Sequence, residues 1–139
     1  MILLDTNVLS ALMLQVPDRR VIEWLDEQPR NSIWTTAITV FEIRFGLQVM
    51  ATGKRQSILL SGFEHLLVET IEGRIAPFDN AAAQLAADLM AARQKKGHLG
   101  ELRDAMIAGI ALATRAAIAT RNVKHFEDVS CLLVNPWNR

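Results

Sequence analysis

Short apolar runs alternate with longer amphipathic segments along the chain. The runs ILL, SIWTT, RIAPFD, AAIAT and CLLV are short and rich in apolar or β-branched residues, and each predicts a strand. Apolar residues recur at helical spacing in the segments between these runs. The predicted helices cover residues 17–29, 38–50, 54–67, 80–97 and 101–115. This alternation predicts an α/β sandwich with a mostly parallel sheet, as a single domain over residues 1–139.

Polar residues at the ends of these segments predict where several helices begin and end. Asp18 precedes one helix, Thr39 stands where the cap of another belongs, and Asp79 or Asn80 precedes a third. Gly97 stands at the end of the alanine-rich helix predicted over residues 80–97, and glycine is typical of a helix end.

Composition narrows the class of protein. Half of the 139 residues are apolar and 22% are charged, which favours a well-packed globular domain over disorder. Cys131 is the only cysteine, so no intrachain disulfide can form, and we expect a reducing, cytoplasmic location. No run approaches the roughly 18 apolar residues of a membrane span. Asp5 and Asn7 interrupt the apolar start, which argues against a signal peptide.

Charge is balanced overall but unevenly placed. Residues 1–92 carry 7 basic and 11 acidic side chains, whereas residues 93–139 carry 8 and 4. The second part can therefore present a local basic face, although a solvated charged surface explains the same counts.

Four polar residues interrupt or border apolar elements: Asp5, Glu42, Asp104 and Asn122. Each has a structural explanation of its own. Asp5 can cap a helix, Glu42 can form a capping box with Thr39, and Asp104 suits the first turn of a helix. Asn122 can occupy a turn, where asparagine tolerates the left-handed conformation.

Together these four residues indicate a site. Asp5 and Asn122 follow strands, while Glu42 and Asp104 lie in early turns of helices that follow loops, and in a parallel sheet such positions share one edge. At ~4 Å and an effective dielectric constant of about 20, each pair of like charges costs on the order of 4 kcal/mol, against ~1 kcal/mol from a cap. A divalent cation would offset that repulsion. All-oxygen ligands suit Mg²⁺, with Mn²⁺ as a substitute, and the three histidines lack metal-ligand spacing.

Six segments carry a resemblance to a known family. In chain order they are ILLDTNVLS, AITVFEIRFGL, GRIAPFD, DAMIAGIALA, ATRNVKHFE and VNPW. Together they resemble PIN-domain ribonucleases, most closely the VapC and FitB toxins of type II toxin–antitoxin systems. The resemblance spans essentially the whole chain, and it implies a three-layer α/β/α sandwich and endonucleolytic cleavage of RNA.

The resemblance also implies roles for individual residues. Asp5, Glu42 and Asp104 match the family's acidic metal ligands. Asn122 stands where many PIN domains carry a fourth acid, which puts a second tightly held metal in doubt, although its carbonyl oxygen can still bind a cation or orient water.

Three neighbouring residues receive supporting roles by the same comparison. Thr6 and Thr120 match hydroxyl groups beside the acidic ligands. Arg121 is left with two alternatives, a contact to phosphate or a surface ion pair.

The leading hypothesis is a Mg²⁺-dependent endoribonuclease that acts through metal-activated water, as the toxin of a toxin–antitoxin pair. One alternative is a catalytically weak PIN-like module in a DNA-bound complex. A second is an aspartyl phosphotransferase with Asp5 as nucleophile, although Asn7 stands where a second aspartate would be expected.

Partners are expected on the same grounds. The family resemblance implies RNA as substrate, a DNA-binding antitoxin, pairing of the chain with itself, and no membrane. An apolar content this high in a small domain predicts that some apolar side chains stay exposed for a partner. The candidates are Leu9, Leu12, Met13, Leu14, Val21, Trp24, Leu25, Phe45, Val49 and Met50.

Overall fold

A computed structural model describes residues 1–138 and contains one five-stranded sheet. The strand order is β3-β2-β1-β4-β5, and each neighbouring pair runs parallel. All five strands fall within the runs predicted from the sequence. They are β1 (Ile2–Leu4), β2 (Ile33–Thr36), β3 (Ile75–Ala76), β4 (Ala117–Ala119) and β5 (Leu133–Val134). The first strand of the chain therefore lies at the centre of the sheet, where Asp5 follows it directly.

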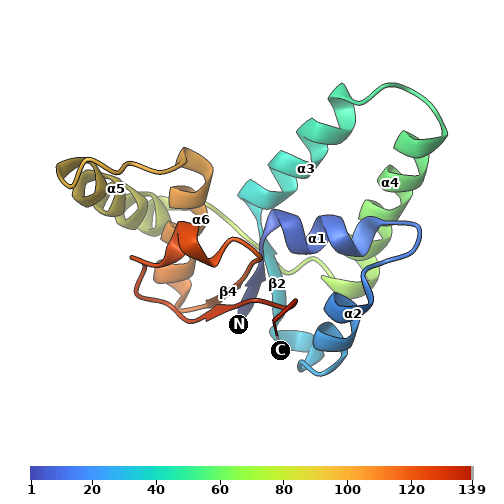
Figure 1. Ribbon diagram of the computed structural model, residues 1–139, viewed down its shortest axis with the longest axis horizontal. Helices are drawn as coiled ribbons and strands as arrows, with labels where there is room; N and C mark the ends of the chain where they lie inside the picture. Colours follow the sequence, from blue (N-terminus) through green and yellow to red (C-terminus); the bar gives the residue numbers. More distant parts are fainter. Residues whose placement is uncertain (139) are drawn as a thin grey trace.

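Helices cover both faces of the sheet, which confirms the three-layer α/β/α sandwich. Figure 1 shows α1 to α4 on one side of the strands and α5 and α6 on the other. The α-helices are α1 (Thr6–Met13), α2 (Arg19–Asp26), α3 (Ala37–Val49), α4 (Lys54–His65), α5 (Asn80–Lys95) and α6 (Leu102–Thr114). Short helical turns are η1 (Arg30–Ser32), η2 (Leu66–Thr70) and η3 (Val123–Phe126).

The alternation of side chains along the central strands divides the core in two. Leu4 and Ala119 face the α1–α4 layer, and Leu3 and Ile118 face the α5–α6 layer. Adjacent parallel strands keep these pairs in register, Leu3 with Ile118 and Leu4 with Ala119. Burial on both faces explains why the strands are continuously apolar rather than alternating.

The predicted helix caps hold at two positions and fail at a third. Asp18 and Asp79 cap α2 and α5, each accepting a hydrogen bond from a backbone N–H of the first turn. The prediction of Thr39 as the cap of α3 is wrong: Thr36 is the cap, and its Oγ1 accepts from the N–H of Thr39 at 3.0 Å. The capping box proposed for Glu42 is therefore wrong as well, and α3 begins directly after β2 rather than after a loop.

Glycine brings α6 close to α5 and so fixes the helix that carries Asp104. A Cβ on Gly109 would lie 2.8 Å from Ala86 Cβ and would also clash with the carbonyl oxygen of Ala82. Substitution there would force the two helices apart, because packed cores tolerate such overlap poorly.

No helix within residues 1–138 is long and apolar enough to cross a membrane.

Candidate active site

Asp5 lies at the carboxyl end of the central strand and also caps α1. The N–H of Thr6 donates to Asp5 Oδ1 at 2.8 Å, and Thr120 Oγ1 donates to Oδ2 at 2.7 Å. The side-chain amide of Asn7 donates to Oδ2 at 3.3 Å. The capping explanation for Asp5 is therefore correct, but capping uses only one of the three donors that converge on this carboxylate.

The pKa of Asp5 is raised above its ordinary value. Burial is the main cause, because only 5% of the residue is exposed, and the negative charge of Asp104 adds to the effect. The three hydrogen bonds act in the opposite direction without cancelling the burial. The fold thus holds a carboxylate where its charge is disfavoured.

Glu42 lies in the second turn of α3, between an uncharged and a charged donor. Thr6 Oγ1 donates to Glu42 Oε1 at 3.2 Å. Arg103, from the first turn of α6, donates from Nη1 to Glu42 Oε2 at 3.3 Å. These contacts link α1, α3 and α6 at one edge of the sheet.

Asp104 lies in the first turn of α6, as expected for a first-turn acid, and is mostly buried. His125 Nδ1, from η3, lies 2.9 Å from Asp104 Oδ2. Burial raises the pKa of Asp104, and the charges of Glu101 and Glu42 raise it further, while His125 opposes them. Asp104 is therefore coupled electrostatically to both of the other predicted carboxylates, Asp5 and Glu42.

Thr120 joins Asn122 to Asp5. The N–H of Asn122 donates to Thr120 Oγ1 at 3.0 Å, and the same hydroxyl donates to Asp5. Asn122 itself is exposed, and its φ of −96° is not left-handed, so that part of the turn explanation is wrong. Both threonines named by the resemblance thus contact an acidic residue of the site.

Arg121 makes an aromatic contact in place of the surface ion pair considered for it, and a contact with phosphate stays a prediction. Its guanidinium lies over the ring of Trp137, 4.7 Å from the centroid, in a cation–π contact. The indole N–H of Trp137 donates to Asp18 Oδ2 at 3.1 Å and fixes the ring. Arg121 therefore ties the end of β4 to the C-terminal segment.

The carboxylates share one edge but do not form a closed metal cage. Among residues 1–138, no three Asp, Glu, His or Cys side chains are close enough together to hold a metal ion. The reason lies in the contacts above: Glu42 is directed to Thr6 and Arg103, and Asp104 to His125. The donors to Asp5 are all uncharged, whereas Glu42 also accepts from the guanidinium group of Arg103.

Three residues of this site were not assigned there from the sequence: Asn7, Arg103 and His125. Asn7 had a usable signal, since an amide two residues after a capping Asp commonly bonds to it. Arg103 and His125 carry no such local signal, because their partners are 61 and 21 residues away along the chain.

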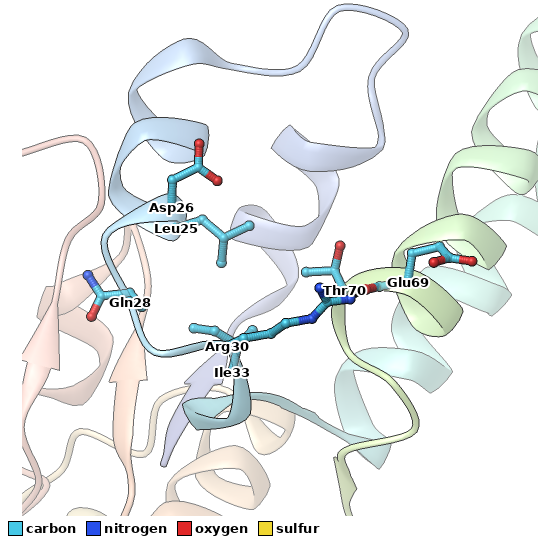
Figure 2. A pocket seen from close by; sticks show the side chains of 7 residues that line it. All are labelled: Leu25, Asp26, Gln28, Arg30, Ile33, Glu69 and Thr70. Carbon is cyan, nitrogen blue, oxygen red and sulfur yellow. Dashed lines mark hydrogen bonds between the residues drawn. The ribbon is translucent and has the colours of Figure 1, made fainter.

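A separate pocket of about 280 Å³ lies between α2 and η2. Figure 2 shows the side chain of Arg30 extending across it toward Thr70 and Glu69. Arg30 donates to the carbonyl oxygen of Glu69 at 2.7 Å. The pocket contains none of the predicted site residues.

Comparison with known proteins places this geometry in a family. The PIN domain model matches residues 2–130. The chain belongs to the PIN-domain family. A VapC ribonuclease, Y4jK of Sinorhizobium fredii, is 41% identical over 137 residues, covering 99% of this chain and 98% of the relative. Toxin FitB of Neisseria gonorrhoeae is 33% identical over 138 residues, covering 99% of each chain.

Solved structures agree with the PIN assignment. A chain in the crystal structure of FitAcB from Neisseria gonorrhoeae matches with a TM-score of 0.88 at 33% identity, over the full length of both chains. A chain in the structure of FitAB bound to an IR36 DNA fragment matches with a TM-score of 0.87 and covers 100% of this chain and 97% of the other. The resemblance inferred from the six motifs is confirmed.

Proposed function

We propose that this PIN domain is a Mg²⁺-dependent endoribonuclease that acts in the cytoplasm as the toxin of a toxin–antitoxin pair. The observation that carries the proposal is that Asp5, Glu42 and Asp104 lie together at the carboxyl edge of the sheet. The charge of Asp104 raises the pKa of Asp5, and the charge of Glu42 raises the pKa of Asp104. Family membership and the 41% identity to a VapC ribonuclease support the same activity.

The donor chemistry of the site suits Mg²⁺ or Mn²⁺. Three carboxylates offer oxygen ligands, which hard divalent cations prefer. Asp5 is held in place by its hydrogen bonds, and Glu42 and Asp104, which contact Arg103 and His125 in this structure, would supply the other two carboxylates. Once bound, such a cation polarises a phosphate and lowers the pKa of water.

The chain's own groups have separate tasks in this mechanism. Thr120 and Asn7 hold the Asp5 carboxylate in one orientation, and Thr6 does the same for Glu42. Arg103, which contacts Glu42 and is half exposed, would supply positive charge beside the site for the RNA backbone. A covalent role for Asp5 is disfavoured, because Asn7 stands where an aspartyl phosphotransferase would be expected to carry a second aspartate.

An exposed apolar face on α3 supports a protein partner. Phe41, Phe45 and Val49 recur every four residues and are 59%, 53% and 68% exposed. The rings of Phe41 and Phe45 stack, with centroids 6.3 Å apart. In Figure 1, α3 and α4 extend together beyond the sheet. This face is suited to an antitoxin segment or to a second copy of the chain, and FitB-like chains are seen in FitAB and FitAcB assemblies.

The apolar residues predicted to face a partner fall into exposed, partly buried and core positions. Leu14, Phe45 and Val49 are exposed as expected, and Leu25 and Met50 are partly buried. The remaining candidates are core residues: Leu9, Leu12, Met13, Val21 and Trp24. Phe41 was not among the candidates, although it is the residue that stacks on Phe45.

The decisive experiment is cleavage of RNA by the purified full-length chain. We expect activity with Mg²⁺ or Mn²⁺, loss of activity in EDTA, and recovery when the metal returns. Cleavage that survives exhaustive chelation would contradict the mechanism. Co-expression with the product of the neighbouring upstream reading frame should inhibit the wild type, and Phe41→Asp with Phe45→Asp should weaken that inhibition.

A further inference from the structure

A second hollow adjoins the carboxylate site and has no role in the mechanism above. Its volume is about 670 Å³, within the range of ligand pockets. It lies between the segment that joins α5 to α6 and the η3 turn, and Asp104 is part of its wall. The lining also includes Lys96, His98, Glu101, Lys124 and Glu127. We call these five residues and their hollow the flanking cleft.

The walls of the flanking cleft are held in place by one buried arginine. Arg93 is 5% exposed, and its Nε and Nη2 each donate to Asp128 at 2.8 Å. Nη2 also donates to the carbonyl oxygen of His125 at 3.1 Å. These bonds join α5 to the η3 segment across the cleft, and bidentate pairs of this kind fix geometry strongly.

Glycine allows the other wall to approach the same arginine. Gly100 has a φ of +72°, and a Cβ there would lie 3.1 Å from Arg93 Nη1. The loop before α6 therefore passes directly over the guanidinium group. Both walls of the cleft therefore pack against the side chain of Arg93, so the cleft is already formed in the absence of a ligand.

The chemistry of the lining distinguishes among possible ligands. A site for phosphate alone would be uniformly basic, but here Lys96 and Lys124 are matched by Glu101 and Glu127. A docking groove for an amphipathic helix would be lined by apolar side chains, whereas every lining residue here except Gly100 has a charged or titratable side chain, and the carbon atoms of these residues supply the apolar surface of the cleft. A nucleobase edge presents hydrogen-bond donors and acceptors together, which such a mixed lining can satisfy.

The flanking cleft shares Asp104 with the carboxylate site. Because Asp104 belongs to both places, a strand whose phosphate lies at the carboxylates must continue past the mouth of the cleft on one side. Single-stranded RNA can turn its bases outward, stack them on histidine and leave its phosphates for lysine.

We propose that the flanking cleft receives the base of a nucleotide next to the scissile phosphate, with Lys96 and Lys124 on the adjoining phosphates. The proposal rests on the proposed ribonuclease function and adds where selectivity for the RNA sequence arises. His98 supplies the stacking surface, and Glu101 and Glu127 accept hydrogen bonds from the base edge.

The first arm of the test measures binding without cleavage. A labelled single-stranded RNA of mixed sequence is titrated in EDTA with wild type, Lys124→Ala, Lys96→Ala and the control Lys54→Ala. Lys54 is exposed at the start of α4, in the opposite helical layer. Each cleft variant should weaken binding several-fold and lower the salt dependence by about 0.7 per lost phosphate contact, while the control should match the wild type.

The second arm maps cleavage ends in total RNA with Mg²⁺. His98→Ala and Glu127→Gln should reduce the preference for the nucleotide beside the cut by about tenfold, with cutting retained. A wild type that cuts selectively, alongside cleft variants of unchanged affinity and preference, would overturn the cleft proposal and leave the nuclease. Cleft-dependent binding without any cutting would overturn the nuclease and leave the cleft as an RNA-binding site only. If the cleft variants lose binding to a partner protein and keep their affinity for RNA, the cleft is a protein-binding site and the proposal is overturned.

Discussion

Asp5 and Asp128 are both held by strong hydrogen bonds, yet the fold moves their pKa values in opposite directions. Burial raises the pKa of Asp5, and the nearby charge of Asp104 adds to that shift. The hydrogen bonds from Arg93 lower the pKa of Asp128, which lies largely at the surface. One carboxylate has uncharged partners and a like charge beside it, and the other has a buried cation.

The difference separates a functional carboxylate from a structural one. Asp128 neutralises Arg93 and so stabilises the fold at neutral pH. Burial and like charges disfavour the ionised forms of Asp5 and Asp104, which is the arrangement expected where a ligand will supply the missing positive charge. Substitution should therefore affect activity at one place and stability at the other.

The largest expected effect is on catalysis. Asp5→Asn, Glu42→Gln and Asp104→Asn should each reduce RNA cleavage by more than about 100-fold, since even partners of metal ligands are worth about 10–100-fold. Thermal unfolding in EDTA should occur at least as high as in the wild type for Asp104→Asn, because a disfavoured charge has been removed. Full activity in any two of the three variants would refute the assigned site, and failure to fold would favour a purely capping role.

The next effect concerns the uncharged donors around Asp5. Thr120→Val removes the hydroxyl that donates to Asp5 Oδ2 and accepts from the N–H of Asn122. Calorimetric titration with Mn²⁺ should show an affinity about 10–100-fold lower, while Thr120→Ser, which keeps the hydroxyl, should stay near the wild type. Equal affinities for the Val and Ser variants would mean that this hydrogen bond does not position a metal ligand.

On the structural side, Asp128→Asn should lower the free energy of unfolding by about 1–3 kcal/mol, because it removes the carboxylate that is hydrogen-bonded to the buried Arg93. The value is below that of a fully buried pair because the Asp128 side chain is 45% exposed. Glu64→Gln provides the matched control: it breaks the exposed pair with Arg44 and should change stability by less than about 1 kcal/mol. Denaturant unfolding measures both, and equal losses would contradict the comparison.

The same pair predicts a dependence on pH. Because the folded-state pKa of Asp128 is lowered from its ordinary 3.8, its contribution is complete above that value and is lost as pH falls through the folded-state pKa. The stability difference between wild type and Asp128→Asn should therefore be constant near neutral pH and shrink toward zero in acid. A difference that grows on acidification would show that another group dominates.

The sequence predicts the frame of this molecule better than the contacts within its site. Asp5 could be placed because an apolar run ends on it, and Asn122 because it is the second residue after another run. The pairing of β1 with β4, which brings Thr120 to Asp5, is typical of a doubly wound sheet but is set by long-range packing. Local pattern therefore finds the edge of the sheet and leaves its side-chain contacts undetermined.

The cap of α3 and the exposed residues of α3 were both difficult to predict, because each depends on how α3 packs in the fold. Thr36 and Thr39 are both good capping residues, and only the register of β2 decides that the helix begins after the first of them. On α3, Phe41, Ile43, Phe45 and Leu47 are all apolar, so no amphipathic pattern separates the buried from the exposed positions. Ile43 and Leu47 enter the core because α3 packs against α1 and α4, which the sequence of α3 alone does not record.

The smallest expected effect tests whether Asn122 belongs with Asp5 or lies outside the metal site. Asn122→Asp adds a carboxylate at the position where the family resemblance implies a fourth acid, and its backbone is already linked to Asp5 through Thr120. Because Asn122 is exposed, solvent screens the added charge, and Mn²⁺ affinity should rise only a few-fold. Asn31→Asp adds the same charge at an exposed position in η1 and should leave the affinity unchanged. A few-fold gain in both variants would reflect net charge alone, whereas no gain in either would place the Asn122 side chain outside the reach of the metal.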